Sequence, residues 1–178
     1  MTLTHHLESA VKFAKETFEK KGSVCPMFIA YNGEKTLTVI ATPWNDEREK
    51  LASLEMVKRI FRLERVTSYV FMSEVWYKSV SPEGLNAHLN SNKAVSEYDD
   101  KEEALMVMGT NTEGEKLGRF FKIKRSAEKT ELLAIENPNG FEGRLFELLS
   151  KPSIVNFDEQ MVALMKDMWN GARKIEIH

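Results

Sequence analysis

A glutamate inside an apolar strand is the residue of this sequence best placed to do chemistry. Glu74 lies in the run 66–77, whose alternating pattern predicts a β-strand. Side chains of a strand alternate between its faces, so Glu74 shares a face with Val70 and Met72. A carboxylate in an apolar layer needs a partner or an opening to solvent. We therefore consider Glu74 a catalytic acid or base, or a structural residue that lies at the surface or pairs with an arginine of the helix predicted after Asp46.

An acidic run precedes the next predicted strand, which begins at Ala104. If this strand pairs with the strand of Glu74, carboxylates from both could converge on Mg²⁺ or Mn²⁺, which prefer oxygen ligands. The candidate metal ligands, beside Glu74, are Asp99, Asp100 and Glu103. Such a site would indicate a metal-dependent hydrolase acting on phosphoesters. The alternative is a solvated turn, because carboxylates this close in sequence normally face water.

A basic strand offers a different chemistry. In the run 117–125, Phe120, Lys122 and Lys124 fall on one face, where an aromatic ring could stack on a base and the lysines could contact phosphates. A nucleic-acid-binding module is therefore a second alternative, although the net charge of -2 disfavours it. An edge strand that lysines protect against aggregation explains the same pattern.

Other chemistry-bearing motifs are missing from the sequence. It has no glycine-rich phosphate loop, no dinucleotide fingerprint, no zinc-binding helix, no Cys-x-x-Cys pair and no nucleophile elbow, so no cofactor is expected. Cys25 is the only cysteine, which rules out an intramolecular disulfide and fits a reducing compartment. The N-terminal residues lack the basic and apolar regions of a secretory signal. We expect a cytoplasmic protein that does not bind membranes.

The elements that must position these residues follow from hydrophobic periodicity. With 178 residues and no linker or repeat, the chain is expected to form one domain, 1–178. The pattern predicts an α+β fold with a mostly antiparallel sheet of about six strands and the order α-β-β-α-β-β-β-β-α-α. A long loop is expected over 79–98. The predicted helices and strands are 7–22 (α), 27–31 (β), 36–41 (β), 46–62 (α), 66–77 (β), 104–110 (β), 117–125 (β), 131–135 (β), 144–149 (α) and 156–171 (α).

Two segments resemble a pattern in uncharacterised small bacterial and phage proteins. They are Val70-Phe-Met-Ser-Glu-Val-Trp76 and, after a loop rich in Ser, Pro and Asn, Asp100-Lys-Glu-Glu-Ala-Leu-Met-Val107. The resemblance covers a small part of the chain and implies no activity. It makes Glu74 and Glu103 worth testing.

The leading prediction is a non-catalytic cytoplasmic protein that acts through protein contacts in an accessory role. Met161, Met165 and Trp169 recur at helical spacing in the last predicted helix. Methionine-rich faces accept partners, so this face is a candidate seam for homo-oligomers. The absence of recognisable catalytic motifs from the sequence supports this prediction by elimination.

Overall fold

The computed structural model describes residues 2–78, 97–126, 129–135 and 144–149, and the structural statements below concern these residues. Most of the predicted 79–98 loop and all of the predicted 156–171 helix lie outside them. The predicted α+β class with a six-stranded antiparallel sheet is confirmed.

Two long helices begin at capping side chains, and the first ends at a glycine. In α1 (Leu3–Lys21), the Thr2 side chain accepts the His5 N–H at the start, and Gly22 ends the helix in the left-handed conformation with φ 72°. In α2 (Glu47–Leu63), the Asp46 carboxylate accepts the Glu49 N–H at 2.7 Å. Short polar side chains at the N-cap and glycine after the last turn stabilise helix ends in this way.

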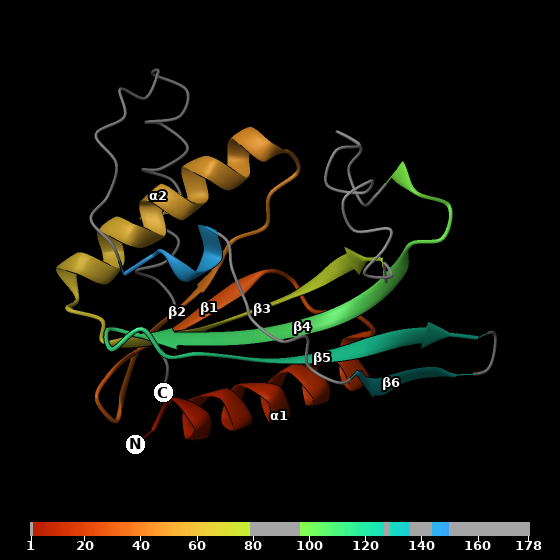
Figure 1. Ribbon diagram of the computed structural model, residues 1–178, viewed down its shortest axis with the longest axis horizontal. Helices are drawn as coiled ribbons and strands as arrows, with labels where there is room; N and C mark the ends of the chain where they lie inside the picture. Colours follow the sequence, from red (N-terminus) through yellow and green to blue (C-terminus); the bar gives the residue numbers. More distant parts are fainter. Residues whose placement is uncertain (1, 79–96, 127–128, 136–143, 150–178) are drawn as a thin grey trace, which may run out of the picture.

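The sheet contains six antiparallel strands in the order β2-β1-β3-β4-β5-β6 (Figure 1). Their bounds are β1 (Met27–Asn32), β2 (Lys35–Ala41), β3 (Ser68–Tyr77), β4 (Glu102–Asn111), β5 (Lys116–Arg125) and β6 (Thr130–Ile135). The turn between β1 and β2 contains Gly33, whose φ of 59° suits glycine. β3 lies inside the sheet, between β1 and β4.

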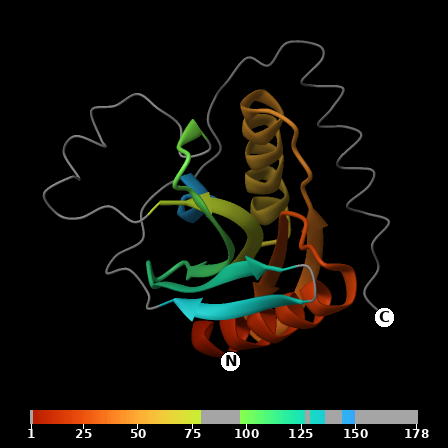
Figure 2. The ribbon, with the colours of Figure 1, turned by 90° about the vertical axis from the view of Figure 1, so that its right-hand side faces the viewer.

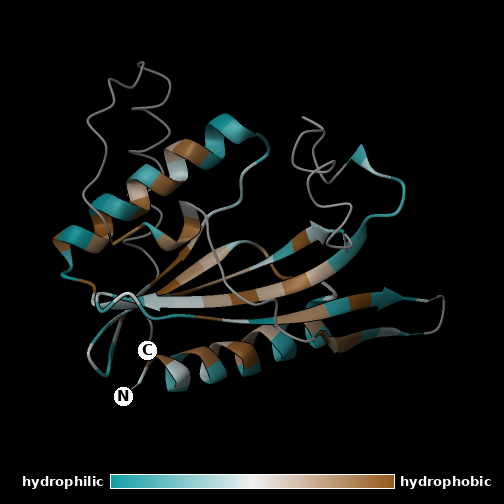
Figure 3. Cartoon of the chain, in the orientation of Figure 1, coloured by the Kyte–Doolittle hydropathy of each residue, from teal (hydrophilic) through white to brown (hydrophobic). Residues whose placement is uncertain are grey.

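The helices cover opposite faces of the sheet (Figures 1 and 2). On the α1 side, Val70 and Met72 of β3 pack in a cluster with Leu7. On the α2 side, Tyr69 and Phe71 pack in a second cluster around Val57, Phe61 and their neighbours. The centre of β3 is therefore apolar on both faces, as its sequence predicts, and Figure 3 shows the hydrophobic colour of the central strands.

A short segment near the end of the described chain adds to the α2 side. The 144–149 helix predicted from sequence is a single 3-10 turn, η2 (Arg144–Phe146), followed by a turn at Leu148. The Tyr69 hydroxyl donates a hydrogen bond to the Leu145 carbonyl. Phe146 and Leu148 are buried in the same cluster as Phe61, so the segment extends the core beside α2.

Candidate functional site

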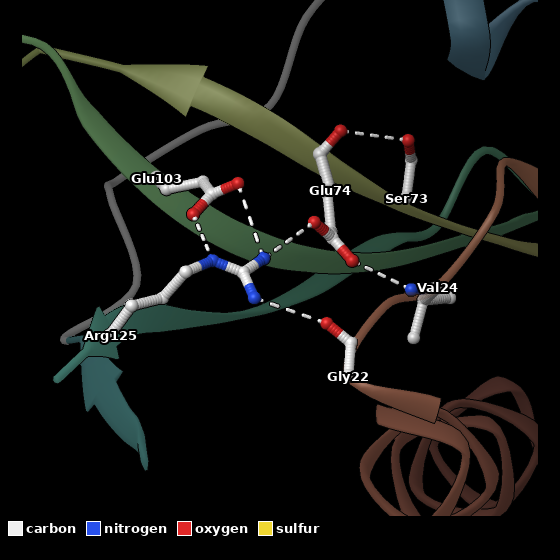
Figure 4. Close-up of polar contacts among 6 residues, drawn as sticks. All are labelled: Gly22, Val24, Ser73, Glu74, Glu103 and Arg125. Carbon is white, nitrogen blue, oxygen red and sulfur yellow. Dashed lines mark hydrogen bonds and ion pairs between the residues drawn. The ribbon is translucent and has the colours of Figure 1, made fainter. Parts of the chain in front are cut away.

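Glu74 lies near the outer end of β3, on the face that α1 covers. Its side chain is 21% exposed. Oε1 accepts the backbone N–H of Val24 at 2.6 Å, and Oε2 lies 3.2 Å from Nη2 of Arg125 (Figure 4). Both carboxylate oxygens therefore have a partner, which compensates for the water lost on partial burial.

Arg125 is the centre of the polar cluster drawn in Figure 4. Its Nε donates to Glu103 Oε2 at 2.8 Å, and its Nη1 donates to the Gly22 carbonyl at 3.1 Å. The guanidinium carbon also lies 5.6 Å from the centre of the Phe18 ring. The hydrogen bond to Glu103, and the charges of Glu103 and Glu74, raise the pKa of Arg125 above its ordinary value. Arg125 is therefore a permanent cation at this position.

Strand register brings the two glutamates together. Glu74 is opposite Leu105 and Trp76 is opposite Glu103, so the two carboxylates are diagonal neighbours on one face. Two carboxylates at such positions repel each other unless a cation compensates them, and Arg125 does so. Together these contacts tie the end of α1 to β3, β4 and β5. We call Glu74, Glu103 and Arg125 the Arg125 cluster.

The predicted arginine partner of Glu74 is wrong. The expected arginine partner belonged to the helix after Asp46, which is α2, whereas the observed partner is Arg125 of β5. The reason is topological, because α2 covers the face of the sheet opposite to the face that carries Glu74. Arg125 was not among the residues singled out from the sequence, because the candidates on this strand, Phe120, Lys122 and Lys124, lie on its other face. The alternation of Phe121, Ile123 and Arg125 was the available signal.

The predicted four-carboxylate metal site does not form. Glu74 and Glu103 meet around Arg125, whereas Asp100 pairs with Lys78 at 2.7 Å and Asp99 is exposed. Within the described ranges, no group of three or more His, Cys, Asp or Glu side chains is placed to hold a metal ion. The physical reason is that a guanidinium already supplies the positive charge that the paired carboxylates require.

On the basic face of β5, Lys122 pairs with a carboxylate of the neighbouring strand β4. Lys122 forms an ion pair with Glu102, which also accepts a hydrogen bond from the Tyr77 hydroxyl. The hydrogen bonds from Lys122 and Tyr77 lower the pKa of Glu102, and burial together with Glu102 raises the pKa of Tyr77 to about 12. Phe120 is half-buried and Lys124 is exposed. The three residues do share a face, but Lys122 is already paired with a carboxylate.

The alternative explanation of this basic strand is wrong. β5 is not an edge strand, because β4 and β6 pair with its two sides. In the described part of the sheet the edges are β2 and β6. Lysines on β5 therefore do not protect a free edge.

Sequence reasoning also missed a pocket at the end of α2. It has a volume of about 270 Å³, and its lining combines basic side chains of α2 with apolar side chains of the 145–149 segment. No local motif marks it, because α2 and the 145–149 segment are far apart in the sequence. The cationic last turns of α2 were the available signal.

Comparisons of the chain with protein-family models, with curated proteins and with solved structures found no match. The resemblance to bacterial and phage proteins therefore stays a prediction. Neither helix of the described chain has the length and apolar character needed to cross a bilayer.

Proposed function

We propose that this protein works by binding and not by catalysis, and that it self-associates through β6. Two observations support the first part. The best candidate for an acid or base, Glu74, has both oxygens engaged in contacts that hold α1 to the sheet. The other candidate carboxylates are divided between Arg125 and Lys78 rather than gathered at one place.

The exposure of β6 is the observation that carries self-association. In the described sheet β6 pairs only with β5, and no described strand pairs with its outer edge. Proteins usually protect such edges with lysine, proline or a bulge. β6 has the sequence Thr-Glu-Leu-Leu-Ala-Ile, and Leu133 is 46% exposed on it. An exposed apolar edge of this kind favours pairing with another strand.

A second copy of the chain is the partner that we propose. A two-fold axis perpendicular to the sheet would pair β6 with its copy in antiparallel orientation and keep each residue on its own face. Pairing centred on Leu133 would place the two exposed leucines opposite each other. The two sheets would then continue into one, and the edge would disappear from each copy.

Analytical ultracentrifugation tests this proposal. The full chain should sediment with twice its mass of 20.5 kDa at high concentration and dissociate on dilution. Leu133→Lys should raise the dissociation constant at least about tenfold, since burying a leucine contributes roughly 1.5–3 kcal/mol and the new cations would repel each other.

Leu63→Lys is the matched control for this experiment. Leu63 is 67% exposed but lies at the end of α2, so the same substitution there should leave the dimer intact. Circular dichroism of both variants would show whether they fold like the wild type. A monomer at every concentration, or equal effects of the two substitutions, would refute self-association through β6.

A further inference from the structure

The pocket at the end of α2 is independent of both the Arg125 cluster and β6. Its basic lining comes from Lys58, Arg62 and Arg65, and none of the described lining residues is acidic. Its apolar lining includes the partly buried Leu149, beside Phe61 and Leu148, which are almost fully buried in the core cluster of that face. The pocket therefore combines cations with an apolar wall, and its 270 Å³ suits a small molecule rather than a drug-sized one.

The charges within the pocket are not all equivalent. Lys58 lies 3.0 Å from Glu55, and both of these side chains are largely buried, so this pair is compensated locally. The two arginines add positive charge, and no carboxylate stands among the described lining residues. Arginine binds carboxylate and phosphate oxygens through a planar fork of N–H donors. Basic side chains also favour a helix C-terminus, so the charge alone does not make the site.

The backbone of Arg65 supplies a second, independent observation. The Val66 N–H bonds to the Phe61 carbonyl at 2.9 Å and the Arg65 N–H to the Arg62 carbonyl at 3.3 Å, which is a Schellman ending. Arg65 occupies its left-handed position with φ 53°, and it is the only non-glycine residue with positive φ in the described chain. Glycine is favoured there, and α1 ends with Gly22 in the same conformation. An arginine held in an unfavourable conformation at a pocket suggests that its side chain is needed.

We propose that this pocket binds a small organic anion, a carboxylate or phosphate monoester that carries an apolar group about the size of a benzene ring. Arg62 and Arg65 bind the anionic oxygens, and Leu149 contacts the apolar group. Lys58 is paired with Glu55 and adds no net charge to the pocket. Neither self-association nor the Arg125 cluster is needed for this binding.

Isothermal titration of the full chain with three probes tests the chemistry. Phenyl phosphate, which has both parts, should bind at least about tenfold more tightly than inorganic phosphate, which lacks the ring. Hexanoate separates the two possible anions: binding tighter than that of phenyl phosphate assigns the site to carboxylates, and weaker binding assigns it to phosphate monoesters. The proposal is overturned if neither phenyl phosphate nor hexanoate binds, or if inorganic phosphate binds as tightly as phenyl phosphate.

Variants locate the site and separate it from a general charge effect. Arg62→Gln and Arg65→Gln should each weaken binding of the tighter probe about tenfold, because each removes charge-assisted hydrogen bonds. Arg59→Gln makes the same change of charge on the same helix but outside the lining, and it should leave the affinity unchanged. Equal losses in all three variants would overturn the site.

Arg65→Gly gives the sharpest result, because affinity and stability should change in opposite directions. Glycine relieves the left-handed backbone, so the midpoint of thermal unfolding should rise. The same variant lacks the guanidinium, so it should bind the probe about tenfold more weakly. Unchanged binding by this variant would show that Arg65 has no part in a site.

Discussion

The contacts of Glu74 show what a half-buried carboxylate needs at the scale of one residue. One oxygen accepts a backbone N–H from the α1–β1 connection, and the other faces a guanidinium from β5. Each contact replaces a hydrogen bond to water that burial removes. Because the partners come from different segments, the side chain also fixes the position of one segment relative to the other. This role requires the charge of Glu74 but no substrate.

The Glu74→Gln substitution should lower the free energy of unfolding by about 1 kcal/mol. The amide oxygen can still accept the Val24 N–H, but the ion pair with Arg125 is lost. Urea denaturation of the variant and the wild type measures the difference. Glu113→Gln, at an exposed position in the β4–β5 turn, is the matched control and should have no effect. A Glu74→Gln protein as stable as the wild type would contradict a structural role for this ion pair.

His6 is a second residue whose environment predicts a measurable property. Its ring is 2% exposed, stacks on Tyr31 at 3.8 Å, and its Nδ1 lies 3.2 Å from Ser68 Oγ. Burial lowers the pKa of His6, and the positive charges of the N-terminal amine and His5 lower it further, against an opposing effect of Glu34. Folded His6 therefore takes up a proton less readily than a histidine of the unfolded chain.

Stability should therefore fall as the pH drops through 6.5, the ordinary pKa of histidine. Below that pH the unfolded chain takes up a proton that folded His6 resists, and this uptake favours unfolding. The stability that neutral His6 contributes is fully present above pH 6.5 and declines between pH 6.5 and the lowered pKa of folded His6. His6→Phe keeps an aromatic ring against Tyr31 but cannot titrate, so its unfolding midpoint should depend less on pH. Identical pH profiles of the two proteins would refute this assignment.

At the scale of single elements, the helix ends are the most direct link between sequence and structure. Asp46 precedes α2 and accepts the Glu49 N–H, while Glu47 and Glu49 lie in the first turn, where the helix dipole favours acidic side chains. At the other end Arg62 lies in the last turn. These local interactions set the start and direction of α2 before any contact with the sheet is considered.

Asp46→Ala should lower stability by about 1 kcal/mol, because it leaves the Glu49 N–H without its capping carboxylate. Asp46→Asn should retain most of the stability, because asparagine caps helices about as well as aspartate. Thermal unfolding of the two variants beside the wild type measures both effects. If alanine and asparagine were equally destabilising, the cap would not be the cause.

At the scale of the whole molecule, helices on opposite faces of the sheet determine which side chains can meet. The face toward α1 carries the Arg125 cluster, and the face toward α2 carries the Glu102–Lys122 pair and the pocket. Charged groups on the two faces are separated by the sheet itself. In the described chain the carboxylates of the two faces therefore do not converge.

The arrangement predicts no specific response to Mg²⁺ or Mn²⁺. Glu74 and Glu103 are already compensated by Arg125, so neither ion should raise the midpoint of thermal unfolding of chelator-treated protein. A ligand at a hundred times its dissociation constant would stabilise by about 2.7 kcal/mol and would be readily detected. A shift with either ion that disappears in Glu74→Gln would restore the metal-dependent hydrolase as the better hypothesis.

Local patterns in the sequence were sufficient to determine the fold class, the two α-helices and the six strands of the described chain. Alternation in 66–77 and in 117–125 identified strands, Gly22 identified the end of α1, and Asn45 or Asp46 was predicted to cap α2, where the structure has Asp46. Hydrophobic periodicity and capping act over a few residues, so they can be recognised without knowing the fold. The doubly buried centre of β3 was predictable for the same reason.

Only the tertiary structure decided which partners these residues have. The partner of Glu74 is Arg125 and not an arginine of α2, because strand order and helix placement put α2 on the other face. The pocket joins Arg62 and Arg65 to Leu148 across a long stretch of chain. Likewise, β6 rather than β5 forms the edge of the described sheet. Strand register, strand order and the face of the sheet that each helix covers depend on contacts between distant segments. No local periodicity encodes them.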